Sequence, residues 1–468
     1  MPRPLPDRRA LVSTFMAGAA IMPALSGAAA AAQRGSREAG TTRAGPASPN
    51  GSGLIPDAAA DQSAALQKAI DEAAIRGVPL ILPPGRIRAS GIKLRPGSIL
   101  SGSGMRSVLI SAGPGPLMFG EGAHGVRLER LVVEGDRDRD PQSMGDDGGL
   151  VEMTASRDVA IADVTITRSS GNGLVLRRCS GRVTGATITQ AGAAGLLSLD
   201  AGGLAIESNR ISDCASNGIL VWRSTVGEDG TRVSGNRIER ITARAGGSGQ
   251  NGNGINVFRA SGVLVTGNRI TGCAYSAIRA NAASNVQMVA NSCERLGEVA
   301  LYAEFGFEGA LIAQNLVDGA ASGISVTNFD EGGRLAVVQG NLIRNLRRRE
   351  HEPVDKRGEG ISVEADASVT GNTIEGAPTA GIVVGWGRWM REVAVTGNVI
   401  RKARVGIMVT RDPAAGTALI AQNLISGVHA GAIRLMENGL PVGEDLARTP
   451  PRSGRITVSS NAVTDEPA

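Results

Sequence analysis

Short runs of alternating apolar and polar residues dominate the chain from about residue 130 to its end. One run in each repeat follows an asparagine, as in GNRI at Asn236 and GNLI at Asn341, and a second run usually starts eight to ten residues later, as in GISV at Gly323. A period of two is typical of β-strands, and the Gly and Asn residues between the runs are typical of turns. The pattern therefore predicts short strands joined by tight turns.

The asparagine repeat has a regular period, because its nine intervals average 28 residues. Short strands at this spacing predict a coil of stacked rungs, in which each rung bonds to the next and aliphatic side chains fill the interior. We expect the asparagines to be structural, since Asn tolerates a left-handed corner and its amide can bond to the rungs above and below. Their positions are Asn209, Asn236, Asn268, Asn291, Asn315, Asn341, Asn372, Asn398, Asn423 and Asn461.

One segment, about residues 61–76, has helical periodicity instead. Its apolar residues at helical spacing are Leu66, Ala69, Ile70 and Ala73. Asp61 or Ser63 can cap its start, and Gly77 ends it. We expect this helix to cover the open apolar end of the coil, where an uncovered rung would present unpaired strand edges.

The first residues have the pattern of an export signal. Arg8 and Arg9 precede an apolar run that ends in an A-x-A sequence, and residues 1–32 resemble a twin-arginine signal peptide. An ordinary Sec signal is the alternative. Residues 33–53 are rich in Gly, Ser and Pro, which predicts a flexible linker. We therefore expect a periplasmic or secreted protein, and, because no second long apolar run follows, no permanent membrane span.

Charge and composition remove several classes of partner. The formal charge of +5 results from 49 basic and 44 acidic side chains, a balance that gives no electrostatic footprint for nucleic acid. No His or Cys cluster has zinc spacing, so neither a metal nor a cofactor is expected. We expect a monomer. The four cysteines are expected to be buried free thiols, because Cys214 and Cys273 lie two repeats apart and Cys293 falls on an inward-facing position.

The helix, the VPLILPPG segment at residues 78–85 and the repeats resemble the right-handed parallel β-helix of the pectate-lyase superfamily, over roughly residues 57–465. With the twin-arginine leader, they also resemble an uncharacterised family of Tat-translocated repeat proteins. The resemblance implies an all-β, right-handed parallel β-helix of about 13 rungs over residues 54–468, with an N-terminal capping α-helix. It implies no single activity, because this fold carries lyases, hydrolases, epimerases and non-catalytic adhesins.

A groove is predicted along the second strand of each repeat. Three long insertions, at residues 134–148, 239–253 and 344–359, fall at one corner of the coil, and aromatic residues gather at the other end of the same strands. Trp222, Phe258 and Trp386 are among them. We expect these aromatic rings to stack on sugar rings; the alternative is that they pack beneath their own loops.

Alternation decides which residues of these strands face outward. In register, Tyr302 should lie beside Arg279, and Glu304 beside Asn281. A cation, a phenol and a carboxylate one rung apart suit β-elimination or epimerisation at an acidic sugar. Arg279 would neutralise the sugar carboxylate, Tyr302 would donate or accept a proton, and Glu304 could assist. An exposed salt bridge on a solvated sheet is the alternative.

The predicted function is therefore binding, and modification of the lyase or epimerase type, of an acidic polysaccharide. The predicted catalytic residues are Arg279, Tyr302 and Glu304, and the predicted substrate-binding residues are Trp222, Asn256, Phe258, Asn281, Glu364 and Trp386. A non-catalytic structural or glycan-binding protein of the cell envelope and a glycoside hydrolase are the alternatives.

Two further patches are weaker candidates. Asp146 and Asp147 resemble the paired aspartates of β-helix polygalacturonases, but the N-x-D, G-H-G and R-x-K motifs of that family are missing, which favours an acidic loop. Lys356 is a possible base by analogy with β-helix lyases, and His351 lies near it. A charge run of this kind is usually a solvated loop.

Overall fold

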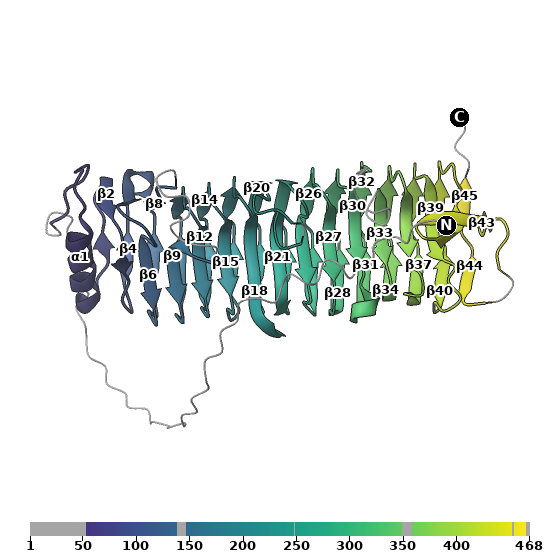
Figure 1. Cartoon of the computed structure of the whole chain (residues 1–468), viewed down its shortest axis with the longest axis horizontal. Helices are drawn as coiled ribbons and strands as arrows, with labels where there is room; N and C mark the ends of the chain where they lie inside the picture. Colours follow the sequence, from purple (N-terminus) through teal and green to yellow (C-terminus); the bar gives the residue numbers. More distant parts are fainter. Residues whose placement is uncertain (1–52, 138–146, 248, 349–357, 452–453, 465–468) are drawn as a thin grey trace, which may run out of the picture. The chain divides into compact units, whose positions relative to one another are not determined.

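The computed structural model describes residues 53–137, 147–247, 249–348, 358–451 and 454–464. All of them belong to one compact unit, Gly45–Ala468. Within these ranges the chain forms three sheets of fifteen strands each (Figure 1). We name the sheets A, B and C.

Sheet A contains β1 (Leu80–Ile81), β4 (Ile99–Ser101), β7 (Arg127–Glu129), β10 (Val159–Ala162), β13 (Gly181–Thr184), β16 (Ala205–Glu207), β19 (Arg232–Ser234), β22 (Leu264–Thr266), β25 (Val286–Val289), β28 (Glu308–Ala313), β31 (Arg334–Gln339), β34 (Ala365–Thr370), β37 (Arg391–Thr396), β40 (Ala418–Ala421) and β44 (Ile456–Ser459). Sheet B contains β2 (Gly85–Ala89), β5 (Ser107–Ser111), β8 (Val132–Glu134), β11 (Thr165–Thr167), β14 (Thr187–Thr189), β17 (Arg210–Ser212), β20 (Arg237–Ile241), β23 (Arg269–Cys273), β26 (Ser292–Glu294), β29 (Leu316–Asp318), β32 (Leu342–Arg344), β35 (Thr373–Glu375), β38 (Val399–Arg401), β41 (Leu424–Ser426) and β45 (Ala462–Thr464). Sheet C contains β3 (Ile92–Lys93), β6 (Met118–Glu121), β9 (Gly149–Thr154), β12 (Asn172–Arg177), β15 (Ala194–Leu199), β18 (Asn217–Glu228), β21 (Asn253–Ser261), β24 (Ile278–Asn281), β27 (Val299–Glu304), β30 (Ser322–Val326), β33 (Glu359–Val363), β36 (Ala380–Val384), β39 (Val405–Thr410), β42 (Ile433–Glu437) and β43 (Leu440–Asp445).

Up to β42 the chain visits the three sheets in turn, so each strand up to β39 pairs with the strand three positions later. The extra strand β43 in sheet C makes β40 pair with β44 and β41 with β45. These pairs are parallel, and β42 with β43 forms an antiparallel hairpin at the end of sheet C. One strand from each sheet makes a rung. Inward side chains stack in columns, as Ile278, Leu301 and Ile324 do on β24, β27 and β30, and all three are fully buried. The predicted fold, an all-β parallel β-helix of about 13 rungs, is confirmed.

The predicted helix is α1 (Ser63–Arg76), and it is the α-helix of the described residues. Its apolar face, which includes Leu66 and Ile70, is buried in the same core as the first rungs. The Oδ1 atom of Asp61 accepts the backbone N–H of Ser63 at 2.9 Å, and Gly77 ends the helix in the left-handed region at φ 65°. The helix is therefore consistent with a cap on the open end of the coil. In the described part of the chain no helix is long and apolar enough to cross a membrane.

The ten asparagines form one continuous ladder between sheets A and B. From Asn236 onward, the Oδ1 atom of each accepts two N–H groups from the asparagine of the previous rung, as Asn315 accepts the backbone N–H and Nδ2–H of Asn291 at 2.9 and 3.0 Å. The Oδ1 atom of Asn209, the first of the ten, accepts the backbone N–H of Ala186. Each Nδ2 also donates to a backbone carbonyl, which for Asn315 is that of Met288. The structural role is confirmed, but the left-handed corner lies one residue earlier, as at Gln314 (φ 58°). The asparagine follows the corner and satisfies polar groups that the turn leaves buried.

The four cysteines are buried free thiols, as predicted. Ile241 and Cys273 are neighbours in register on β20 and β23, which places Cys214, on the rung of β17, two rungs from Cys273. Two rungs separate backbones by ~10 Å, which is beyond the reach of a disulfide.

Candidate functional site

The outer face of sheet C has two rows of side chains that point away from the core. The first row contains Asn256, Arg279, Tyr302, Ser325 and Ser362 on consecutive strands. The second contains Trp222, Phe258, Asn281 and Glu304. Tyr302 is paired in register with Arg279, and Glu304 with Asn281, so the predicted register is confirmed.

Buried charged side chains are concentrated on one part of this face, from β24 to β33. The described residues include six buried charged side chains, and five of them lie on or beside β24, β27 and β33: Arg279, Glu298, Glu304, Glu359 and Glu364. The sixth is Asp229, between β18 and β19. Burial of a charge is unfavourable unless it is paired and hydrogen-bonded. A concentration of such groups on one face therefore marks a candidate functional site.

Arg279 is the centre of this cluster. Its Nε and Nη2 atoms donate to the two carboxylate oxygens of Glu304 at 2.6 and 2.9 Å, and Nη1 lies 3.5 Å from Oε2 of Glu298. The guanidinium carbon lies 4.8 Å from the ring centroid of Tyr302, a cation–π contact. Asn281 donates from Nδ2 to Oε1 of Glu304 at 3.0 Å. We name Arg279, Asn281, Glu298, Tyr302 and Glu304 the Arg279 cluster.

The environment keeps Arg279 charged. Burial by itself would lower the pKa of this guanidinium, but the nearby carboxylates of Glu304 and Glu298 raise it further, so the net pKa is above its ordinary value. Arg279 is therefore a poor general base. Two carboxylates already occupy its donors, so it is not an open receptor for a sugar carboxylate.

The expected exposure of these residues is wrong. Arg279 and Tyr302 are 6% and 7% exposed, and Glu304 is 1% exposed. Part of the cover is the loop before β21, where a β-carbon at Gly249 would lie 3.6 Å from Nη2 of Arg279. Asn256 fixes that loop, because its Nδ2 donates to the carbonyl of Gly249 at 2.8 Å. The predicted residues lie together, but beneath their loops.

The aromatic part of the second row is more accessible. Trp222 and Phe258, both half-buried, meet edge to face with their ring centroids 5.9 Å apart. The indole N–H of Trp222 donates to Oδ1 of Asn256 at 3.1 Å, and the guanidinium carbon of Arg259 lies 4.7 Å from the Phe258 ring centroid. We name Trp222, Phe258 and Arg259 the aromatic platform. These contacts fix the platform, and Phe258 is paired in register with Asn281 on the neighbouring strand β24.

The two other predicted binding residues lie farther along sheet C. The carboxylate of Glu364 accepts the backbone N–H of Phe329 at 2.8 Å, and Glu364 is buried. Trp386 and Trp389 form an isolated antiparallel β-bridge. The ring of Trp389 packs edge to face against that of Phe329, with the ring centroids 6.0 Å apart. β27, which ends at Glu304, is two strand steps (~10 Å) from β33, which precedes Glu364, and three (~14 Å) from β36, which precedes Trp386. Both residues therefore lie on the same face as the Arg279 cluster, two and three strands beyond it.

The comparison with protein-family models supports the β-helix fold. The family described as "Right handed beta helix region" matches residues 149–242, 172–343 and 217–400. These matches run together from residue 149 to residue 400, more than half of the chain. The chain belongs to this right-handed β-helix family. No curated protein matches its sequence.

Solved structures share the β-helix fold at low sequence identity. The N-terminal fragment of bacteriophage phi29 gene product 12 is 15% identical over 89% of this chain and 70% of its own, with a TM-score of 0.53. The pre-mature form of gene product 12 is 16% identical and has a TM-score of 0.49; the match covers 83% of this chain and only 55% of that one. The A-module of a mannuronan C-5 epimerase from Azotobacter vinelandii is 15% identical over 88% and 99% of the two chains, with a TM-score of 0.47. At 15% identity, the likeness to the N-terminal fragment of gene product 12 shows the fold alone.

Sequence reasoning missed three residues of this β-helix face. Glu298 lies just before β27, outside the alternating pattern, and Glu359 begins β33, where it accepts a hydrogen bond from Ser362 at 2.7 Å. Arg259 follows Phe258 at the corner. A charged residue at either end of a repeat strand is the signal that could have found them.

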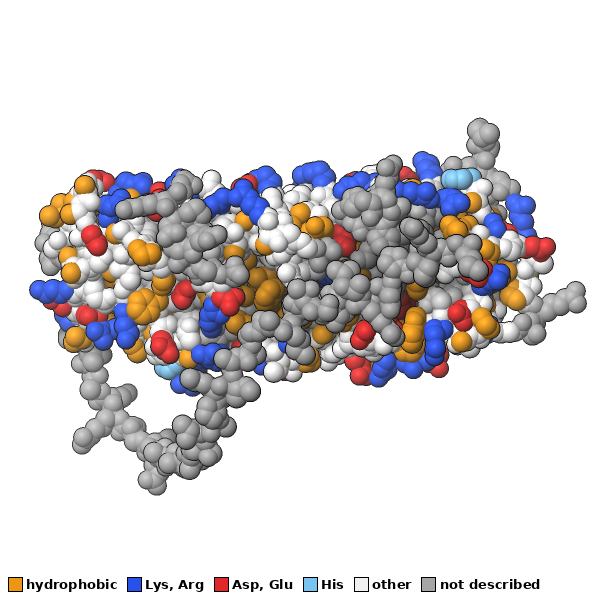
Figure 2. All heavy atoms as spheres, in the orientation of Figure 1, with side chains coloured by type: hydrophobic (Ala, Val, Ile, Leu, Met, Phe, Trp, Pro, Cys, Tyr) orange, Lys and Arg blue, Asp and Glu red, His pale blue; other side chains and the backbone are white. Residues whose placement is uncertain are grey.

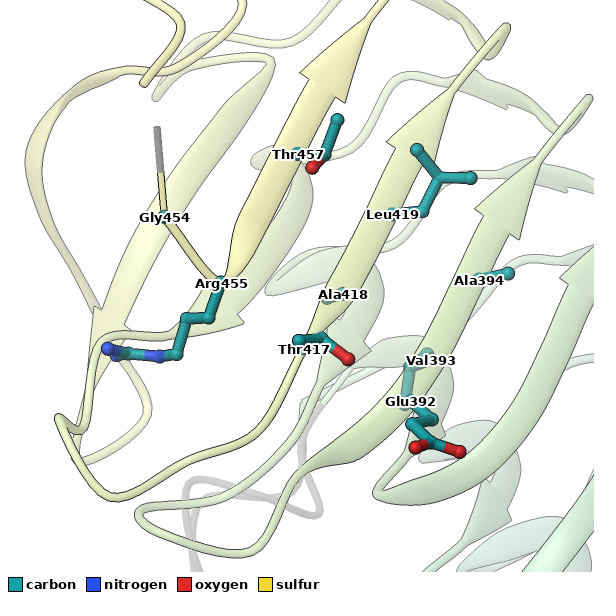
Figure 3. Close-up of a pocket in the computed structure, with 9 residues that line it drawn as sticks. All are labelled: Glu392, Val393, Ala394, Thr417, Ala418, Leu419, Gly454, Arg455 and Thr457. Carbon is teal, nitrogen blue, oxygen red and sulfur yellow. The ribbon is translucent and has the colours of Figure 1, made fainter. Parts of the chain in front are cut away.

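The hollow drawn in Figure 3 lies on a different face of the β-helix. It holds about 320 Å³ on sheet A, over β37, β40 and β44. Glu392 and Arg455 are its charged lining residues, and Ala394 and Leu419 make its floor apolar. None of its lining residues is a buried charged residue, so we place the candidate site on sheet C.

Figure 2 shows basic and acidic side chains interspersed over the face in view, without a large area of one charge sign.

Several predicted residues lie outside the described ranges: Arg8, Arg9, Asp146, His351 and Lys356. Asp147 is described and exposed. Among the described residues no group of three or more His, Cys, Asp or Glu side chains is arranged to hold a metal ion.

Proposed function

We propose that this β-helix protein binds a polysaccharide along the outer face of sheet C and that the Arg279 cluster transfers protons on the bound sugar. The observation that carries the proposal is the burial of five charged side chains on this one face. The scaffold does not need them there. On other rungs the row of Arg279 holds apolar residues, such as Leu197 on β15 and Met408 on β39. The row of Glu304 holds Leu199 on β15, and Glu359 is in register with Ala380 on β36. Charges kept where apolar residues fit are typical of functional sites.

The aromatic platform supports the binding part of the proposal. Trp222 and Phe258 offer ring surface beside a polar cluster, the combination that a sugar ring with one apolar face requires. The Trp222–Asn256 hydrogen bond fixes the indole before ligand arrives, which reduces the entropy lost on binding.

The cluster can supply acid–base chemistry. Glu304 is held by Arg279 and Asn281, and Tyr302 is held beneath the guanidinium, so both groups have fixed positions. Elimination or epimerisation at an acidic sugar, with Tyr302 as the proton donor or acceptor and Glu304 assisting, is the reaction we propose. Arg279 then positions these two residues rather than receiving the sugar carboxylate.

Glycoside hydrolysis is the second candidate, and a specific observation favours it. Ala303, Val326 and Val363 are aligned in register on β27, β30 and β33, so the residues that follow on the first and third of these strands, Glu304 and Glu364, are two strands apart. Two strand steps place their backbones ~10 Å apart. A pair of carboxylates across a gap is the arrangement that hydrolysis uses.

We also propose that the protein acts outside the cytoplasm, because Arg8 and Arg9 begin a twin-arginine-like leader. Fusion of residues 1–53 to a reporter that is active only after export would test this. Loss of export on replacement of both arginines by Lys is expected, and unchanged export would contradict a twin-arginine route.

A panel of acidic and neutral polysaccharides tests the function. Binding is measured by affinity electrophoresis, and products by ultraviolet absorbance of unsaturated uronides and by new reducing ends. New reducing ends together with ultraviolet absorbance support a lyase, and new reducing ends without absorbance support a hydrolase. Binding with neither signal supports epimerisation or a purely binding role, and NMR of the recovered polymer distinguishes these two. Absence of binding to every polymer would refute the proposal.

A further inference from the structure

Arg259 is an accessible cation beside the aromatic platform. Its guanidinium stacks on Phe258, and Nη1 donates to the backbone carbonyl of Ser224 at 3.0 Å. The side chain is half-buried, and no carboxylate of the described residues pairs with it. Ser224 is itself held by Asp200, which accepts its backbone N–H and its hydroxyl at 2.7 and 2.6 Å. The guanidinium is therefore oriented by a fixed contact but is not neutralised.

Arg259 and Arg279 differ in what occupies their donors. Arg279 is 6% exposed and lies between Glu304 and Glu298. If it received a third carboxylate, Glu304 would lose its partner inside the protein, which is strongly unfavourable. Arg259 can receive a carboxylate through its Nε–Nη2 edge without displacing a partner among the described residues. A planar guanidinium edge matches the two oxygens of a carboxylate.

We propose that Arg259 is the residue that recognises the carboxylate of an acidic polysaccharide, with the sugar ring stacked on Trp222 and Phe258. This inference rests on the proposed function and gives its site a substrate class, a polymer of uronic acid units. Phe258 is paired in register with Asn281, which bonds to Glu304. A sugar held by Arg259 is therefore one strand step, ~4.8 Å, from the start of the Arg279 cluster along the second row.

The β18–β21 ribbon explains why the platform is built here. β18 has 12 residues, whereas β15 before it has 6, and in Figure 1 it extends past its neighbours. Its register with β21 shifts between Trp222 and Gly227, which carries Ser224 out to the position where it accepts from Arg259. The same irregular segment thus presents both the aromatic ring and the partner that orients the cation.

The test compares Arg259→Gln with Arg388→Gln. Gln is suitable at position 259 because it takes the same left-handed backbone at Gln314, with φ 58° at both positions. Arg388 is a matched control, since it also stacks on an aromatic ring, that of Trp389 at 5.1 Å, but lies on the far side of the candidate site. The probes are a polyuronate and the same polymer after chemical reduction of its carboxylates to alcohols.

Arg259→Gln is expected to weaken binding of the polyuronate by about tenfold or more, the effect of one charge-assisted contact, and to leave binding of the reduced polymer unchanged. Arg388→Gln should change neither. Equal weakening for both polymers, or no weakening for the polyuronate, would overturn the inference while leaving the proposed function intact. If the wild-type protein binds neither polymer nor any other polysaccharide of the panel, both the inference and the proposed function fail.

Discussion

Arg279 holds Glu304 through two parallel hydrogen bonds in a site that solvent barely reaches. We predict that Arg279→Leu will destabilise the protein by about 3–5 kcal/mol, because the carboxylates of Glu304 and Glu298 lose their buried cation. Urea or thermal unfolding followed by circular dichroism measures the change. The double variant Arg279→Leu with Glu304→Leu should regain most of the loss, since leucines fill the same rows at Leu197 and Leu199.

An exposed pair of the same geometry is the control. Arg240 donates to both oxygens of Asp213 at 2.7 and 2.8 Å, but the two side chains are 58% and 41% exposed. Arg240→Leu should therefore change stability by roughly 0–1 kcal/mol. If Arg240→Leu lowered the free energy of unfolding as much as Arg279→Leu, burial would not explain the effect of the Arg279–Glu304 pair.

The asparagine ladder gives a second prediction. Asn315→Ala should destabilise the coil by about 2–5 kcal/mol, because two N–H groups of Asn291 and the carbonyl of Met288 lose their partner inside the protein. Asn461→Ala removes the last and partly exposed member of the ladder, so its effect should be smaller. Equal effects of the two substitutions on the unfolding midpoint would contradict a cooperative buried ladder.

The outcome for the ladder shows what the sequence could predict. The strands, their register and the hydrogen-bonding role of the Asn amide could be predicted because the same sequence pattern recurs in every rung. The pairing of Tyr302 with Arg279 follows from the alternation of inward and outward residues along the strands. The left-handed residue was misplaced by one, because glycine at that corner in some repeats and Ser, Ala or Gln in others hides the signal.

Burial of the site could not be predicted in this way. It depends on loops such as the one containing Gly249, and on Glu298, which lies in a connection rather than a strand. No periodicity relates a loop residue to the side chain it covers. The sequence therefore located the Arg279 cluster but predicted solvent around it, and it missed the neutralising carboxylate.

Asp229 gives a pH-dependent prediction. Burial raises the pKa of its carboxyl above the ordinary value of 3.8, with hydrogen bonds from Thr231 and the charge of Arg223 opposing the shift, while Glu228 adds to it. The folded protein thus binds this proton more tightly than the unfolded chain. The stabilisation is complete below pH 3.8 and is lost as pH rises through the folded pKa.

Asp229→Asn should therefore be more stable than wild type at neutral pH, and the difference should disappear toward low pH. Unfolding temperatures from about pH 3 to 8 measure it. Asp330→Asn, at an exposed position, should leave the wild-type profile unchanged. A variant less stable than wild type at pH 7 would show that the charged carboxylate is favourable there.

The cysteines should be inert in the folded protein. Burial raises the pKa of Cys214 and of Cys273 to about 12, and a buried thiol reacts only as an accessible thiolate. We predict no reaction with a disulfide reagent at pH 8 until denaturant is added, when all four thiols react. A cysteine placed at exposed position Ser224 should react at once. Fast labelling of the native wild type would contradict the assigned burial.

Tyr302→Phe separates chemistry from binding. The substitution keeps the ring beneath the guanidinium of Arg279 and removes only the hydroxyl. If Tyr302 transfers a proton, turnover of the polymer identified by the panel should fall by about 10²–10⁴-fold, while binding changes less than about twofold. Ser325→Ala, the next residue of the same row, is the control and should affect neither. Full turnover by Tyr302→Phe would remove Tyr302 from the chemistry and leave the carboxylates of Glu304 and Glu298 as the groups of the Arg279 cluster able to act as a base. Weakened binding without a change in turnover would assign the hydroxyl to substrate contact instead.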